Sequence, residues 1–160
     1  MLKARRFSWY GLAVVLIALD QASKAWVTTH FLPGEQRTVT PFFNLVLAHN
    51  TGAAFSLLAE AGGWQRVFFI AVALIATAVI VWLIERHREE PRFCFALSLI
   101  LGGALGNLID RLRLGYVVDF LDFHAAGWHW PAFNVADTAI TVGALLLVWD
   151  SLRRGTASKS

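Results

Sequence analysis

Charged residues are scarce in this 160-residue chain, and cysteine is almost absent. Asp, Glu, Lys and Arg make up 16% of the sequence and hydrophobic residues 57%, a balance that excludes an ordinary water-soluble domain. Cys94 is the only cysteine, so neither an intrachain disulfide nor a zinc site built from several cysteines is possible. The composition therefore predicts a protein embedded in a lipid bilayer.

Several modular and catalytic signals are also missing. There is no internal repeat, low-complexity tract or long linker, so residues 1–160 are predicted to form a single domain. The sequence contains no H-E-x-x-H and no G-x-S-x-G, and the close pair His124 and His129 lies in an aromatic loop. We therefore expect no metal ion and no cofactor.

What the chain has instead is four long apolar segments. About 20 apolar residues are needed to cross about 30 Å of hydrocarbon as a helix. The segments of roughly this length are residues 7–28, 67–84, 93–109 and 133–149. They predict an all-α membrane protein with four transmembrane helices. The short β-prone runs "RTVT" and "FNLVLA" after the first span add a small strand-containing segment outside the membrane.

Positive charge predicts how the spans are oriented. The start "MLKARR", the turn "ERHREEPR" and the C-terminal tail each hold three of the 14 Lys and Arg residues. Because cytoplasmic flanks are rich in these residues, both termini should be cytoplasmic and residues 29–66 and 112–132 extracytoplasmic. The start also resembles a signal peptide, but its apolar run continues and three spans follow, so we expect an uncleaved helix. This charge distribution indicates membrane lipids and no nucleic acid partner.

The polar residues of three spans fall at one level, near the extracytoplasmic surface. At 1.5 Å per helical residue, this level includes Asp20, Lys24, Asn107, Asp110, Arg111, Asn134 and Asp137. The connection that carries Asp119 leaves the third span and enters the fourth on the same side of the membrane. Folding can therefore bring Asp119 and Asp137 together without crossing the bilayer.

Such a pair of carboxylates has a chemical use. In a site of low dielectric constant the two groups share one proton, so one can activate water while the other donates to a peptide carbonyl. Simpler roles are a solvated loop carboxylate for Asp119 and a helix N-terminal charge for Asp137. Asp122 competes for any catalytic role. The residue types alone leave these alternatives open.

The other polar residues also have structural interpretations. Asp20 and Lys24 are four residues apart, as in an ion pair on one helical face, and Asp110 with Arg111 could be an ordinary helix-end pair. A protein of another class, a small proton-coupled transporter, would distribute ionisable groups across the membrane, whereas the second span has none. A non-catalytic membrane scaffold would use the polar cluster to set helix register.

Five motifs lie in order along the chain and, with the four spans, cover nearly all of it. They are "DQASK" (residues 20–24), "HNTGAAFS" (49–56), "GGALGNLIDR" (102–111), "GYVVDF" (115–120) and "PAFNVADTAIT" (131–141). Their content and order resemble the motif series of bacterial lipoprotein signal peptidases, also called signal peptidase II.

The resemblance implies an intramembrane aspartic endopeptidase of the bacterial inner membrane, acting as a monomer without a cofactor. Its substrates would be prolipoproteins, cut just before a diacylglyceryl-modified cysteine, with membrane lipids as surroundings. The catalytic pair of the family corresponds to Asp119 and Asp137. Positions that bind substrate or support the pair correspond to Asn50, Gly52, Asn107, Arg111, Asn134 and Ala136. Structural polar positions correspond to Asp20, Lys24 and Asp110.

Overall fold

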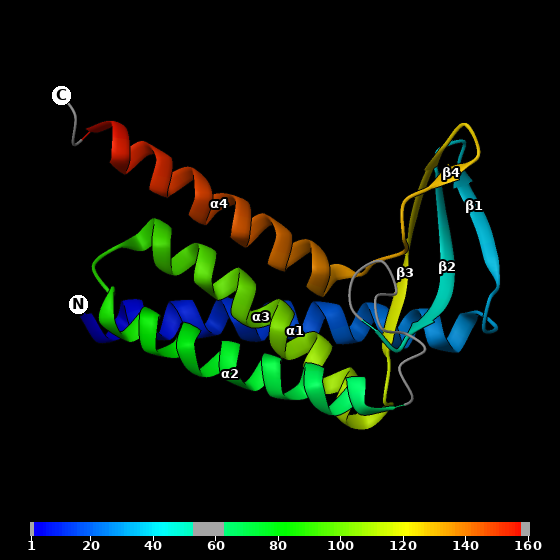
Figure 1. Cartoon of the computed structure of the whole chain (residues 1–160), viewed down its shortest axis with the longest axis horizontal. Coiled ribbons are helices and arrows are strands. Elements are labelled where there is room, and N and C mark those ends of the chain that lie inside the picture. The colour runs from blue at the N-terminus through cyan, green and yellow to red at the C-terminus, as the bar shows by residue number, and fades with distance from the viewer. Residues whose placement is uncertain (1, 53–62, 158–160) are drawn as a thin grey trace.

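Four helices lie side by side in the computed structural model, and a small sheet stands at one end of them (Figure 1). The structure describes residues 2–52 and 63–157, with side chains for residues 9–52 and 63–153. Residues 53–56 of the "HNTGAAFS" motif lie outside the described residues. The N- and C-termini and the turn between α2 and α3 share the end that is remote from the sheet (Figure 1).

The helices are α1 (Leu2–His30), α2 (Trp64–Arg86), α3 (Pro91–Arg113) and α4 (Val135–Ala157), and each is long and apolar enough to cross a membrane. They confirm the four predicted spans but are longer than the apolar runs. The additional turns are rich in Arg, a residue that favours helix whether or not lipid covers it. Each helix therefore continues beyond its apolar run.

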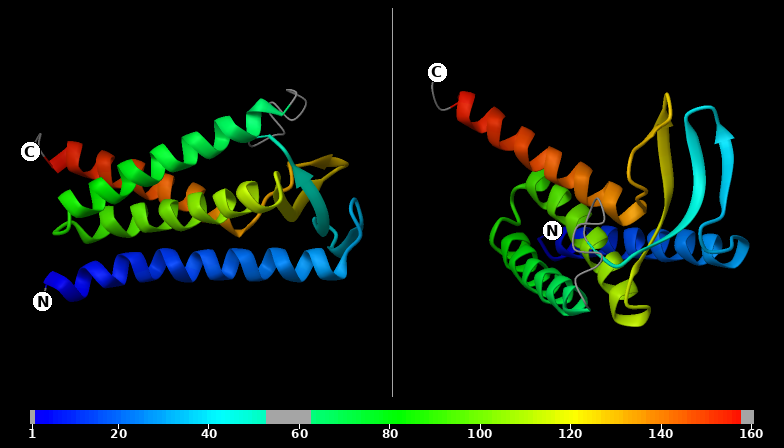
Figure 2. Two further views of the ribbon diagram at one scale, coloured as in Figure 1. Left: turned by 90° about the horizontal axis from the view of Figure 1, so that it is seen from below. Right: turned by 45° about the vertical axis from the view of Figure 1, so that its right-hand side comes forward.

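The core of the helical part is α3, which packs against the three other helices. Its glycines allow this close approach. A Cβ atom at Gly102 would lie 2.8 Å from Leu16 Cβ, and one at Gly103 would lie 2.3 Å from the Ala136 carbonyl oxygen. Most of α3 is consequently buried, whereas α2 and α4 expose large apolar side chains along their lengths. Both views in Figure 2 show α3 among the other helices.

The sheet is antiparallel, in the order β1 (Gln36–Thr40), β2 (Phe43–Asn50), β3 (Val117–Ala125) and β4 (Trp128–His129). The first two strands match the predicted β-prone runs. The third comes from the connection between α3 and α4, for which no strand was predicted, although its Val, Phe and Leu residues favour one. One face of β3 packs Val118 and Phe120 against Val27 and Phe31 at the end of α1. This contact holds the sheet against the helices.

Candidate active site

Asp119 and Asp137 come from different elements and meet where the sheet joins the helices. Asp119 lies near the start of β3, opposite Ala48 of β2, and is 2% exposed. Asp137 lies in the first turn of α4 and is half-buried. Their charges interact, because Asp137 raises the pKa of Asp119. The structure thus brings the two carboxylates into one site.

Asn134 connects the Asp119 carboxylate to the backbone of Asp137. Its side-chain nitrogen donates a hydrogen bond to Asp119 Oδ1 at 2.6 Å, and its side-chain oxygen accepts one from the backbone nitrogen of Asp137 at 2.9 Å. The second bond is a helix cap, in which a side-chain oxygen satisfies an amide of the first turn. Asn134 is completely buried, so both bonds are protected from water. One amide therefore positions both acids.

A second set of contacts reaches Asp119 from β2 and the end of α3. Asn50 Nδ2 donates to Asp119 Oδ2 at 3.0 Å, and Asn50 Oδ1 accepts from the Gly52 amide at 3.0 Å. Arg111 Nη2 donates to the Gly52 carbonyl at 2.9 Å, and its guanidinium carbon lies 5.0 Å from the centre of the Phe69 ring. These contacts tie the turn after β2 to α3.

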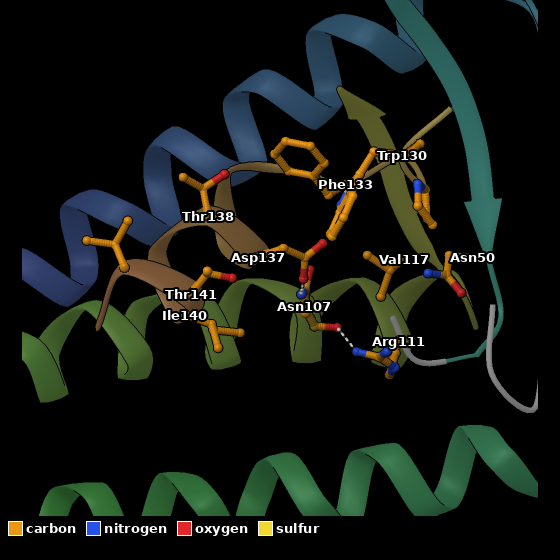
Figure 3. Close-up of a pocket in the computed structure, with 13 residues that line it drawn as sticks. Asn50, Asn107, Arg111, Val117, Trp130, Phe133, Asp137, Thr138, Ile140 and Thr141 are labelled. Carbon is orange, nitrogen blue, oxygen red and sulfur yellow. Dashed lines mark hydrogen bonds between the residues drawn. The ribbon is translucent and has the colours of Figure 1, made fainter. Parts of the chain in front are cut away.

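A third set leads to Asp137 through a buried lysine. Lys24 Nζ donates to Asn107 Oδ1 at 2.8 Å, and Asn107 Nδ2 donates to Asp137 Oδ1 at 2.7 Å. Figure 3 shows Asn107 on α3 pointing directly at Asp137. Because the oxygen of Asn107 faces Lys24, its nitrogen must face Asp137. The lysine thereby sets the orientation of the amide that contacts the carboxylate.

Lys24 is itself held by two buried carboxylates. Asp20 and Asp110 each place an oxygen 2.8 Å from Lys24 Nζ. The sequence had suggested an ordinary helix-end pair of Asp110 with Arg111. In the structure Asp110 pairs with Lys24 instead. Asp20 also accepts a 2.9 Å bond from the Ala136 amide. The ion pair predicted within one helix thus joins α1, α3 and α4.

Two contributors were missed by the sequence analysis. Gln21 donates to Asp110 Oδ1 at 2.8 Å and to the Gly106 carbonyl at 3.2 Å. Arg66 of α2 donates to the carbonyls of Arg111 and Leu112 at 2.9 and 3.0 Å. Gln21 lies inside the "DQASK" motif and could have been found there. Arg66 gives no signal in sequence because its partners are backbone oxygens 45 and 46 residues away.

Electrostatics favour a shared proton. Burial, followed by the nearby charge of Asp137, raises the pKa of Asp119 to about 7. Hydrogen bonds from Asn50 and Asn134 and the charge of Lys24 oppose this rise without cancelling it. Asp119 is thus close to half-protonated at neutral pH, as an acid that must both hold and release a proton requires.

A cavity of about 420 Å³ opens beside this site. Its polar lining is provided by Asn50, Asn107, Arg111 and Asp137, and its apolar lining by Val117, Trp130, Phe133, Ile140 and Val142. Figure 3 shows Asp137 in the middle of these residues and Arg111 at their edge, on the side of Asn50 and Val117. Asp119 is not part of the lining; it is buried and accepts a hydrogen bond from Asn50, which is part of it. The cavity therefore presents one carboxylate directly and contacts the other through an amide.

Asp122, the competing carboxylate, is directed elsewhere. It accepts a 2.8 Å bond from Asn44 and lies 2.9 Å from His129 Nδ1, whereas Asp119 is directed towards Asn50 and Asn134. Within the part of the chain that the structure describes, no group of three or more His, Cys, Asp or Glu side chains is placed to hold a metal ion.

Comparisons with known proteins identify the family. The family model described as signal peptidase (SPase) II matches residues 12–153. This chain belongs to the signal peptidase II family. A lipoprotein signal peptidase from Ralstonia nicotianae is 62% identical over 91% of this chain and 84% of that protein. One from Cupriavidus necator is 59% identical over 91% and 83%.

The fold agrees with that of solved membrane enzymes. A solved structure described as a bacterial membrane enzyme superposes with a TM-score of 0.85 and 32% sequence identity, covering 96% of this chain and 92% of that one. A second structure with the same description gives a TM-score of 0.80. The four helices and the small sheet of this signal peptidase II chain are thus shared with a membrane enzyme.

Proposed function

We propose that this chain is a membrane aspartic endopeptidase that removes signal peptides from prolipoproteins, with Asp119 and Asp137 as its catalytic pair. The family and the names of its relatives support lipoprotein signal-peptide cleavage and do not favour a transporter or a scaffold. The observation that carries the residue assignment is Asn134, whose one buried amide contacts both acids. The bond that is cut precedes the diacylglyceryl-modified cysteine.

In the proposed reaction, Asp137 is the base and Asp119 the acid. Asp137 lines the cavity and takes a proton from a water molecule that attacks the scissile carbonyl. Asp119, with a pKa near 7, donates its proton to the carbonyl oxygen as the water attacks. When the C–N bond breaks, the proton that Asp137 took from water passes to the leaving amine, and a hydroxyl of the tetrahedral intermediate returns a proton to Asp119. Asn50 lines the cavity and is hydrogen-bonded to Asp119, so the entering peptide displaces this amide before the proton is transferred.

The remaining polar residues position these groups. Arg111 and Asn50 line the same cavity as Asp137 and can bind carbonyl oxygens of the substrate backbone. Gly52 holds the turn that carries Asn50, while Asn107 and Ala136 connect the start of α4 to Lys24 and Asp20. Asp20, Lys24 and Asp110 are structural, because each is fully engaged in the buried ion-pair cluster. Apolar residues of α4 beside the cavity face the lipid-modified part of the substrate.

The proposal includes an orientation in the bacterial inner membrane. Arg86, Arg88 and Arg92 lie at the turn between α2 and α3, at the end remote from the sheet, and the positive-inside tendency supports a cytoplasmic location there. Both termini would then be cytoplasmic, and the sheet and the active site extracytoplasmic. Residues 1–160 act as one domain and as a monomer, because all proposed catalytic groups come from one chain.

The test is cleavage of a diacylglyceryl-modified prolipoprotein by the purified protein in detergent. We expect the wild type to cut before the modified cysteine, and Asp119→Asn and Asp137→Asn each to lose at least about 10³-fold in rate while remaining folded. Asp122→Asn is the matched control, since it changes a carboxylate of the same strand outside the site and should retain most activity. Equal activity in all four proteins would overturn the residue assignment, and an inactive wild type would overturn the function.

A further inference from the structure

Helix α2 contains no residue of the five motifs and none of the groups in the proposed reaction. It packs on α3 and exposes large apolar side chains along most of its length. Its first turns are different, because Arg66 and Phe69 both contact Arg111, which lines the active-site cavity. In Figure 3, Arg111 extends from α3 towards α2. These contacts connect α2 to the site.

Phe69 contacts the side chain of Arg111. The guanidinium carbon lies 5.0 Å from the centre of the Phe69 ring, within the distance of about 6 Å at which a cation is attracted to the face of an aromatic ring. Both residues are half-buried, so water weakens this attraction less than it would at an exposed site. On its other side, Arg111 donates to the Gly52 carbonyl at 2.9 Å. The ring and the carbonyl together fix the direction of the guanidinium.

Arg66 contacts the backbone at the same position. Its Nε donates to the Arg111 carbonyl at 2.9 Å, and its Nη2 donates to the Leu112 carbonyl at 3.0 Å. These carbonyls belong to the last turn of α3, where no following turn supplies helical N–H donors. The planar guanidinium binds both oxygens at once and places a cation at the negative end of the helix. The start of α2 is thereby joined to the end of α3.

These contacts affect what Arg111 can do for a substrate. A free arginine side chain has many rotamers, and ordering it costs conformational entropy. With Phe69, Gly52 and Arg66 in contact, that entropy is lost when the protein folds rather than when the substrate binds. Arg111 can then present its other N–H groups to a substrate carbonyl in a fixed direction.

We propose that Phe69 and Arg66 are positioning residues that preorganise Arg111 for binding the substrate backbone. The inference rests on the proposed function, because it requires Arg111 to bind a carbonyl oxygen of the prolipoprotein. Neither Phe69 nor Arg66 lines the cavity, so neither touches the reacting atoms. Loss of either contact should therefore weaken substrate binding and leave the chemical step nearly unchanged.

The experiment measures KM and kcat for cleavage of a diacylglyceryl-modified prolipoprotein by the full-length protein in detergent. Phe69→Leu removes the ring but keeps an apolar side chain, and we expect KM to rise about tenfold with kcat within about twofold of the wild type. Phe69→Tyr keeps the ring face and should leave KM within about twofold. Arg66→Gln should raise KM about threefold. The matched control is Phe95→Leu, the same change at the other end of the helices, which should alter neither constant.

A role in folding alone would give a different pattern. A partly unfolded preparation contains fewer active molecules, so kcat falls while KM stays the same. That pattern in Phe69→Leu would overturn the proposal, as would an unchanged KM or equal impairment of Phe69→Leu and Phe69→Tyr. If a thermal unfolding scan shows that Phe69→Leu is not folded, the KM of Arg66→Gln decides, because Arg66 is exposed.

Failure of this inference differs from failure of the proposed function. An inactive wild type would overturn the proposed function and this inference with it. An active wild type whose KM is unaffected by the substitutions at positions 66 and 69 would overturn the inference alone.

Discussion

Replacing Asp119 by Asn should make the protein gain stability relative to the wild type as the pH rises. Asn has almost the same shape as Asp and carries no ionisable group. Its NH2 replaces one of the two oxygens that accept from Asn50 and Asn134, and the loss of that bond is the same at every pH. The wild-type carboxyl is 2% exposed, so ionising it in the folded state costs free energy, because water cannot solvate the charge. Removing the group removes that cost.

The size of the effect follows from the pKa of Asp119. The folded protein holds this pKa at about 7, against an ordinary value of 3.8. Below about pH 4 the carboxyl is protonated in both folded and unfolded chains, and its full contribution to stability is present. Between about pH 4 and 7 the unfolded chain releases the proton first, so wild-type stability falls. At about 1.4 kcal/mol per pH unit, the fall is about 4 kcal/mol.

Thermal unfolding in detergent, measured from pH 4 to 8 on both proteins, tests this. The difference in unfolding free energy between Asp119→Asn and the wild type should grow by about 4 kcal/mol across that range and level off above pH 7. A difference that stays constant, or that shrinks with rising pH, would refute an elevated pKa. Such a result would leave Asp119 ionised at rest and remove it as the acid.

Asp122 supplies a control of opposite sign on the same strand. Burial raises the pKa of Asp122, but hydrogen bonds from Asn44 and His129 outweigh it and hold this pKa below its ordinary value. Its contribution to stability is therefore present above about pH 4 and is lost as the pH falls through the lower, folded-state value. Asp122→Asn should accordingly be the less stable protein at neutral pH and approach the wild type in acid.

Two further predictions concern the packing that supports the site. Lys24→Met should lower stability by about 3–5 kcal/mol, because Asp20 and Asp110 would remain as buried charges without their cation. Adding Asp110→Asn should restore part of this loss in the same thermal unfolding assay. A Lys24→Met protein as stable as the wild type would contradict the buried ion-pair cluster. Gly106→Ala should cost about 1–3 kcal/mol, because its Cβ atom would lie 2.6 Å from Asp20 Oδ2, whereas Gly11→Ala, with nothing within 4 Å, should cost nothing.

The sequence predicted the four helices because membrane spans are long and uniformly apolar, and length alone distinguishes them. It also indicated that the polar residues of three spans share one level, and the contacts of Lys24 with Asn107 and Asp110 agree with that. The strand β3 was not predicted. Asp119 and Asp122 interrupt its apolar run, and a strand that carries a buried carboxylate on each face looks like a polar loop.

The hydrogen-bond network of the site could not be predicted from the sequence, for a physical reason. Asn134 contacts Asp119 across 15 residues, but Asp20 contacts the Ala136 amide across 116, and no periodicity links such positions. Backbone groups also provide many of the partners, as for Arg66, and a backbone group has no signature in sequence. Pairings of this kind depend on how α1, α3 and α4 pack together, and that packing cannot be inferred from residue patterns in a single sequence.

The bonds of Asn134 also bear on how the enzyme is made. Asp119 and Asp137 are both in the last third of the chain, and the amide that joins them caps the final helix. While the ribosome is still delivering that helix, the earlier spans can already occupy the membrane, but the two acids are not yet assembled. On the proposed assignment, a nascent chain without α4 lacks one of the two acids, so activity would require that helix to be in place.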